Sequence, residues 1–98
     1  MSNSFLYLKN KIITRKLVVG IVGLGYVGLP LANRLIKKKI SVIGVDYDKN
    51  KILSLINGVK YIKSIDNRTT NYFKKNKENV SASYKVLNQA DIIIVCLP

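Results

Sequence analysis

The sequence predicts an α/β fold built on a parallel sheet, and three observations support this prediction. Apolar, strand-like runs alternate along the chain with segments of helical periodicity. The first run, Leu17–Val22, leads directly into a glycine-rich turn and a helix start. A second run, Ile40–Val45, ends at the acidic residue Asp46. Strands and helices in this alternating order form one parallel sheet with right-handed crossover connections.

The chain begins with an N-terminal extension, residues 1–16, ahead of the sheet-forming part, residues 17–98. The apolar residues of the extension have roughly helical spacing, which predicts a short amphipathic helix. We expect its apolar face to pack on the domain or on a partner subunit. That face is formed by Phe5, Leu6, Leu8, Ile12 and Ile13.

The first strand, Leu17–Val22, is apolar apart from one glycine, as expected of a strand covered on both faces. The helix after the turn is expected to begin near Gly25 and to run to about Lys38. Pro30 falls in its first turns, where a missing N–H does little harm. The predicted buried side consists of Leu31, Leu35 and Ile36.

The second strand covers Ile40–Val45, and a second helix is expected from about Lys49 to Asn57, where Gly58 ends it. From Val59 to Asn79 the apolar pattern weakens. This stretch predicts a loop anchored by its few apolar residues, Tyr61, Ile62 and Ile65, followed by a polar helix over residues 71–77.

The last part of the chain predicts a short strand, a helix and a fourth strand. The short strand covers residues 80–82, and Ser83 is a suitable N-cap for a helix through Gln89. Asp91–Leu97 contains four consecutive β-branched residues and gives the fourth strand. The predicted element order is therefore β-α-β-α-β-α-β.

The turn after the first strand carries the spacing G-x-G-x-x-G at Gly23, Gly25 and Gly28. In a dinucleotide-binding unit these glycines permit a tight turn, close approach of a pyrophosphate to the backbone, and close helix–strand packing. The backbone N–H groups of Tyr26 and Val27 lie at the helix start and form an anion site. The alternative is that the glycines serve packing only.

Asp46 lies at the end of the second strand, roughly 20 residues after the motif, where a Rossmann unit places the carboxylate that binds a ribose hydroxyl. Such a carboxylate repels the 2′-phosphate of NADP, so we expect NAD as cofactor. The alternative for Asp46 is a helix N-terminal cap. The sequence therefore predicts a Rossmann-type parallel sheet. A complete domain of this type has two βαβαβ halves, and the chain is expected to be a truncated domain with the first half only.

The composition limits the partners. The net charge is +12, from 17 basic and 5 acidic residues, which makes nucleic acid a formal candidate. The lysines lie at helix ends and in polar loops, outside any recognised nucleic-acid motif, so we expect no nucleic-acid partner. With no histidine and one cysteine, no metal site and no internal disulfide are expected. No apolar run approaches the roughly 18 residues of a membrane span, and we expect a cytoplasmic location.

Segment Gly20–Ala32, which reads GIVGLGYVGLPLA, closely resembles the opening of the UDP-glucose/GDP-mannose dehydrogenase family. The run YVGLP at Tyr26–Pro30 is more specific than the glycines alone. The similarity extends through Ile43–Asp46, to Lys51, and to the final segment Ala90–Pro98. Within the family, the N-terminal extension and the pair Tyr61–Ile62 look most like the members acting on UDP-N-acetylhexosamines.

This resemblance implies an NAD-dependent, two-step oxidation of a sugar C6 alcohol to a carboxylate through a thiohemiacetal on a cysteine. In family members that cysteine, the catalytic lysine and the sugar-binding domain lie beyond the position of Pro98. We therefore expect no catalytic residue in this chain, no activity of the chain alone, and a UDP-sugar substrate and homo-oligomer for a full-length enzyme. Cys96 is expected to be a structural core residue, because a buried apolar strand raises the pKa of a thiol.

The resemblance also assigns Lys51 to the family's basic residue near the adenosine ribose or phosphate. The alternative is an ordinary solvated lysine. Two other functions stay open from the sequence: a Rossmann dehydrogenase of the 3-hydroxyacyl or 6-phosphogluconate type, and a nucleotide-binding module without catalysis. The YVGLP run disfavours the first of these.

Overall fold

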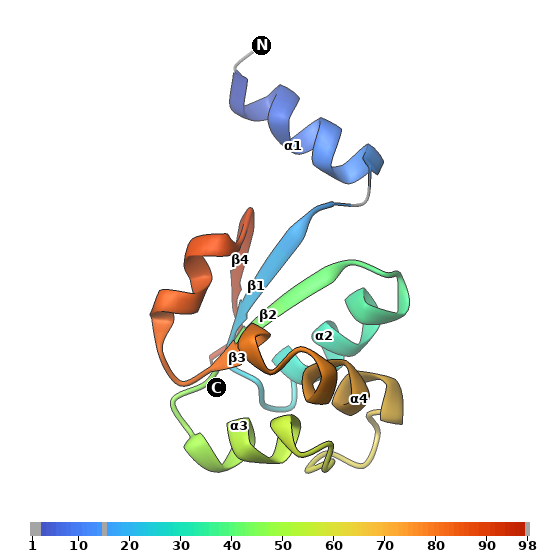
Figure 1. The fold of residues 1–98 in the computed structure, drawn as a ribbon, viewed down its shortest axis with the longest axis vertical. Helices are drawn as coiled ribbons and strands as arrows, with labels where there is room; N and C mark the ends of the chain where they lie inside the picture. The colour runs from blue at the N-terminus through green and yellow to red at the C-terminus, as the bar shows by residue number, and fades with distance from the viewer. Residues whose placement is uncertain (1–2, 15, 98) are drawn as a thin grey trace.

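In the computed structural model, which describes residues 3–14 and 16–97, a four-stranded sheet has helices on both faces (Figure 1). The strands are β1 (Val18–Val22), β2 (Ser41–Val45), β3 (Val80–Ser81) and β4 (Ile92–Val95). They stand in the order β3-β2-β1-β4, and all three pairs are parallel. This is the sheet that the alternating sequence pattern predicts.

The helices are α1 (Asn3–Thr14), α2 (Gly28–Lys37), α3 (Lys49–Ile56) and α4 (Asn67–Lys75), with short 3₁₀ helices η1 (Lys77–Asn79) and η2 (Tyr84–Gln89). All of them except α1, which precedes β1, lie in crossovers between parallel strands. α2 and α4 lie on one side of the sheet, and η2 lies beside β4 on the other (Figure 1). Because all the strands are parallel, their carboxyl ends lie at the same edge of the sheet, between the start of α2 and the start of α3.

The core lies between the sheet and α2, α3 and α4. β1 and β2 are buried along nearly their whole length, as expected for central parallel strands. The largest fully buried side chains include Phe73, Ile21, Leu24, Leu29, Ile43 and Leu55. On α2 the buried apolar side chains are those of Leu29, Ala32 and Ile36, whereas Leu31 and Leu35 are only half-buried.

Two helices begin at other residues than the sequence predicts, and a third segment forms another type of helix. α2 begins at Gly28, three residues after Gly25, because the residues between them form a turn. The polar helix begins at Asn67 and not at residue 71, since the Asp66 side chain accepts the backbone N–H of Arg68 and caps it. Ser83 is the expected N-cap, but the helix it starts, η2, is a 3₁₀ helix.

α1 extends away from the sheet at the end opposite the carboxyl ends of the strands (Figure 1). The Tyr7 hydroxyl donates to Asp91 Oδ1 (3.0 Å), and Asp91 Oδ2 accepts the backbone N–H of Val18 (2.9 Å). These two bonds attach the helix to the start of β1 and β4. Leu8 packs against the core. The side chains of Phe5, Ile12 and Ile13, expected on the same apolar face, lie outside the described residues.

Candidate functional site

The backbone conformation and the close packing of the turn between β1 and α2 require glycine at two positions. Gly23 has a φ of +97°, which side chains rarely allow, and its N–H donates to Val45 O (2.7 Å). A Cβ on Gly28 would collide with the carbonyl oxygen of Gly23, so α2 can approach β1 this closely only with glycine there. The turn is thus pinned between β1, β2 and α2.

Gly25 differs from the other two glycines because the space next to it is open. A Cβ built on it would meet only Lys51 Nζ, at an ordinary contact distance of 3.7 Å. The chain itself therefore has no packing requirement for glycine at this position. An open surface on the backbone suits the close approach of a ligand.

The start of α2 presents free backbone donors. The N-cap residue Val27 makes no side-chain cap, and none of the backbone hydrogen bonds between described residues uses the N–H groups of Tyr26 or Val27. Tyr26 is 86% exposed and Val27 is 68% exposed. Unsatisfied N–H groups at a helix N-terminus, with the positive end of the helix dipole, attract an anion.

Asp46 follows β2 and is buried, with a relative exposure of 6%. Its Oδ2 accepts the N–H of Leu24 in the glycine turn (2.8 Å), and its Oδ1 accepts the N–H of Asp48 (2.9 Å). Asp46 is not the cap of α3, because the Asp48 side chain caps that helix through the N–H of Asn50. Each carboxylate oxygen can accept more than one hydrogen bond, so Asp46 can still receive ribose hydroxyls.

Lys51 comes from the first turns of α3 and reaches toward the glycine turn. Its Nζ lies 3.8 Å from Asp46 Oδ2, and its side chain is 34% exposed. The ammonium group therefore stands beside the only strongly buried carboxylate among the described residues. This position is more specific than that of a solvated lysine on a helix surface.

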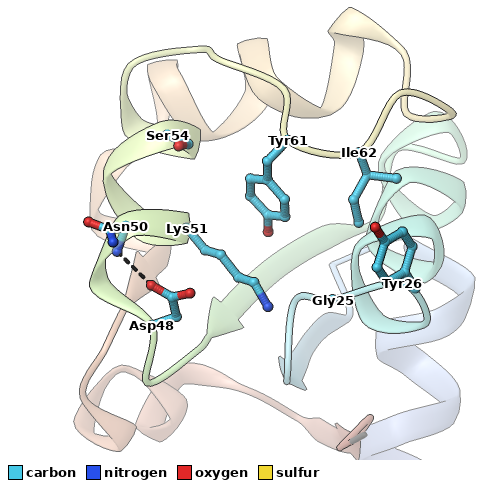
Figure 2. A pocket seen from close by; sticks show the side chains of 8 residues that line it. All are labelled: Gly25, Tyr26, Asp48, Asn50, Lys51, Ser54, Tyr61 and Ile62. Carbon is cyan, nitrogen blue, oxygen red and sulfur yellow. Dashed lines mark hydrogen bonds between the residues drawn. The ribbon is translucent and has the colours of Figure 1, made fainter.

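Two hollows meet at Lys51, Gly25 and Tyr26. The first, of about 230 Å³, lies over the carboxyl ends of β1, β2 and β4. The second, of about 350 Å³, lies between α3, the glycine turn and the loop after α3, as Figure 2 shows. The first hollow brings together six of the seven sequence-predicted residues, namely Gly23, Gly25, Tyr26, Val27, Asp46 and Lys51. The seventh, Gly28, lies behind them against β1.

Sequence reasoning missed three tyrosines at these hollows. Tyr47 and Tyr84 line the first, and Tyr61 lines the second. Tyr84 follows β3 and Tyr47 follows β2, so their positions at the carboxyl ends of parallel strands were a usable signal. Tyr61 had no such signal, because its contact with the glycine turn joins residues 37 positions apart.

Cys96 follows β4 and lines the first hollow. It is half-buried and packs against the core, but the strand before it is not the buried strand expected from the sequence. Val95 and Leu97 are 61% and 62% exposed, because β4 is the last strand of the sheet among the described residues. The Cys96 N–H donates to Val22 O (2.7 Å), which extends the pairing of β4 with β1.

Residues 3–14 and 16–97 contain neither a candidate metal site nor a candidate membrane span. No group of three or more His, Cys, Asp or Glu side chains there could hold a metal ion. No helix in that part of the chain combines the length and apolarity that a membrane span requires.

Comparison with known proteins identifies close similarity over most of the chain. Residues 17–98 match the sequence model of the NAD binding domain of the UDP-glucose/GDP-mannose dehydrogenase family. A UDP-N-acetyl-D-mannosamine dehydrogenase of Methanococcus vannielii is 33% identical over 78 residues, which cover 80% of this chain and 18% of the relative. A UDP-N-acetyl-D-glucosamine 6-dehydrogenase of Salmonella typhi is 54% identical over 41 residues, covering 42% and 9% of the two chains.

A solved structure gives the same result for the fold. The UDP-D-ManNAc dehydrogenase from Pyrococcus horikoshii superposes with a TM-score of 0.71 at 28% sequence identity, over 83% of this chain and 20% of that one. The chain thus spans less than a quarter of the length of these relatives.

Proposed function

The chain belongs to the UDP-glucose/GDP-mannose dehydrogenase family, of which it carries the NAD-binding domain, and we propose that the glycine turn, Asp46 and Lys51 hold the cofactor. The residues fit a dinucleotide in two respects. The backbone beside Gly25 is open, and the N–H groups at the start of α2 have no partner among the described backbone groups. NAD, when bound, supplies the hydride acceptor for an alcohol oxidation.

Each proposed residue has a distinct role. Gly25 lets the pyrophosphate approach the backbone, and the N–H groups of Tyr26 and Val27 donate to it. Asp46 accepts hydrogen bonds from the hydroxyls of the adenosine ribose, and Lys51 supplies positive charge beside the ribose and the phosphates. Gly23 and Gly28 give the turn its shape and its contact with β1. The observation that carries this proposal is the buried Asp46 carboxylate, which is bonded to the glycine turn itself.

The first prediction concerns the choice between NAD and NADP. The purified chain is expected to bind NAD more tightly than NADP in calorimetric titrations, because the 2′-phosphate would stand against the Asp46 carboxylate. Asp46→Ala is expected to weaken NAD binding by about 1–3 kcal/mol, the range for a charged hydrogen-bond partner. Asp48→Ala is a matched control, since it removes a neighbouring carboxylate that caps α3.

Equal affinity for the two cofactors, or tighter binding of NADP, would contradict the ribose assignment. Loss of NAD binding in the Asp48→Ala control, at an unchanged α-helix content, would show that general negative charge or the fold of α3 matters more than Asp46. An unchanged NAD affinity in Asp46→Ala would also contradict the ribose assignment.

We further propose that the whole protein oxidises the C6 alcohol of a UDP-N-acetylhexosamine to a carboxylate, with UDP-N-acetyl-glucosamine as the first substrate to test. The support is the names of the relatives, one of which acts on UDP-N-acetyl-D-glucosamine and another on UDP-N-acetyl-D-mannosamine. NADH formation by the native protein, followed by absorbance with each UDP-sugar, tests the substrate. A preference for UDP-glucose would overturn it.

The remaining expectations on location and partners are also proposals. A cytoplasmic location is supported by the single cysteine, which cannot form a disulfide within this chain and is consistent with a reducing compartment. Homo-oligomerisation is tested by light scattering of the native protein. Absence of a nucleic-acid partner is tested by a gel-shift titration at physiological salt, where binding of random duplex DNA below micromolar concentrations would contradict it.

A further inference from the structure

Tyr61 makes a hydrogen bond to the glycine turn that no sequence motif predicts. Its hydroxyl donates to the carbonyl oxygen of Leu24 at 2.6 Å. In Figure 2 the ring projects from the loop after α3 into the second hollow, between the Lys51 and Ile62 side chains. The bond therefore links that loop to the residue immediately before the open glycine.

Leu24 is consequently held from three directions. Its N–H donates to Asp46 Oδ2 (2.8 Å) and its carbonyl accepts from Tyr61. Its side chain is fully buried and packs so closely on Gly44 of β2 that a Cβ added to Gly44 would collide with it at 2.9 Å. The three contacts come from β2, from the residue after β2, and from the loop after α3, so the turn is fixed independently of any ligand.

The carbonyl of Leu24 and the N–H of Gly25 belong to one peptide unit. Because a trans peptide is planar and its C=O and N–H point in opposite directions, a bond that fixes the carbonyl also fixes the Gly25 N–H. No cis peptide occurs in the described residues. The Tyr61 bond thereby sets the orientation of the backbone at the point where Gly25 is open.

The surroundings of Tyr61 keep its hydroxyl in place as a donor. The loop that carries it is anchored by Ile62 and Ile65, which are 6% and 2% exposed. Burial, with the nearby carboxylates of Asp46 and Asp48, raises the pKa of Tyr61 above the ordinary tyrosine range. The hydroxyl therefore stays protonated at neutral pH.

We propose that Tyr61 is a positioning residue for the cofactor: by fixing the Leu24–Gly25 peptide it prepares the backbone surface on which the pyrophosphate lies. This inference rests on the proposed function of the glycine turn. Tyr61 acts through Leu24, and the preorganised turn loses less conformational entropy when the ligand binds. Its effect belongs to the pyrophosphate part of the cofactor and not to the adenosine part.

The test compares Tyr61→Phe with Tyr72→Phe. Both variants lose one tyrosine hydroxyl that bonds to the backbone, since the Tyr72 hydroxyl accepts the N–H of Val42 in β2 at 3.0 Å, away from the turn. Tyr61→Phe is expected to weaken NAD and ADP binding about fivefold, the effect of one neutral hydrogen bond, and to leave adenosine binding unchanged. Tyr72→Phe is expected to lower the unfolding midpoint and to leave all three affinities unchanged.

A rescue variant separates positioning from a folding defect. Placing p-aminophenylalanine at position 61 restores an N–H donor on the same ring, so ADP affinity is expected to return toward that of the unsubstituted chain. The inference is overturned if Tyr61→Phe binds ADP as the unsubstituted chain does, or if it loses ADP and adenosine affinity equally. Failure of the unsubstituted chain to bind NAD would instead contradict the proposed function itself.

Discussion

At the residue scale, the three glycines of one motif have different physical requirements. Gly28 faces the Gly23 carbonyl at a distance that no side chain permits, whereas Gly25 faces open space. Gly23 needs its positive φ. A substitution therefore has a different effect at each position: it strains the backbone at Gly23, fills open space at Gly25 and disrupts helix–strand packing at Gly28.

This difference gives a matched pair of variants. Gly25→Val is expected to keep the secondary structure and to abolish NAD binding, because its side chain fills the space that the pyrophosphate needs. Gly28→Ala is expected to lower the free energy of unfolding by about 1–3 kcal/mol, the usual cost of overpacking, since α2 must move away from Gly23. Circular dichroism melts and calorimetric NAD titrations of both variants measure the two effects. Unchanged affinity in a folded Gly25→Val would mean that the glycine serves the chain and not the ligand.

Much of the candidate site was predictable from the sequence because it is local. Gly23, Gly25 and Gly28 lie on one turn, and Asp46 is at the end of the next strand, so spacing alone places them together. Tyr61 was not predictable, because its approach to Leu24 depends on how the loop after α3 packs. The hydrogen bond from the Leu24 N–H to Asp46, the proposed ribose acceptor, was not predictable either, because it requires the folded geometry.

At the element scale, hydrophobic periodicity located the helices and strands with apolar faces and misplaced α4. The inner face of α4 includes Thr69 and Thr70, which are almost fully buried beside Phe73. The Thr69 hydroxyl bonds to Asn33 of α2, and the Thr70 hydroxyl donates to the carbonyl of Asn67. Because the buried face of α4 consists partly of hydrogen-bonded polar side chains, it has no continuous apolar periodicity. The sequence pattern therefore predicts only part of this helix.

The start of α4 carries a second prediction, on pH. A hydrogen bond from Lys37, 3.1 Å away, lowers the pKa of Asp66 below its usual range. A carboxylate with a lowered folded-state pKa stabilises the fold above its unfolded pKa of about 4, and this stabilisation is lost as the pH falls through the folded value. Both side chains are more than 40% exposed, so the ion pair contributes about 0.5 kcal/mol or less.

Chemical denaturation at pH 7 and pH 3 measures this contribution. Lys37→Gln is expected to reduce the stability difference between the two pH values, and 1 M salt is expected to have the same effect on the unsubstituted chain. Asp66→Asn keeps an acceptor for the Arg68 N–H and removes only the charge, whereas Asp66→Ala also removes the cap and is expected to cost about 1 kcal/mol more. If Asp66→Asn and Asp66→Ala are equally stable, the cap contributes nothing.

At the scale of the whole molecule, the two edges of the sheet are unlike. β3 is two residues long and pairs with Gly44 and Val45 of β2. Beyond this pairing, the Tyr72 hydroxyl accepts the N–H of Val42 in β2, and the Asn79 side-chain amide donates to the Val42 carbonyl. β4 pairs only with β1 among the described residues. It carries exposed apolar side chains at every position except Ile94 and also just beyond its end, namely Ile92, Ile93, Val95 and Leu97. No lysine or proline interrupts this edge between Ile92 and Leu97, so it lacks the usual protection of an edge strand.

The last prediction follows from this edge together with the net charge of +12. Mutual repulsion opposes association at low salt, and its range shortens to about 10 Å at 0.1 M salt. The purified chain is therefore expected to self-associate through β4 increasingly as salt and concentration rise, which light scattering measures. Ile93→Lys, at a side chain that is 50% exposed, is expected to suppress association because it places a charge on the pairing edge.

The control for this variant is Leu53→Lys on α3. Leu53 is 56% exposed and lies outside the sheet, so this substitution adds the same charge and removes a similar apolar side chain without touching β4. Equal suppression by the two variants would mean that net charge, not the strand edge, governs association. A chain that stays monodisperse at high salt and concentration would show that the apolar side chains of β4 do not form a pairing surface. Suppression by Ile93→Lys alone would locate the association at β4, because only that variant changes the edge where strand pairing occurs.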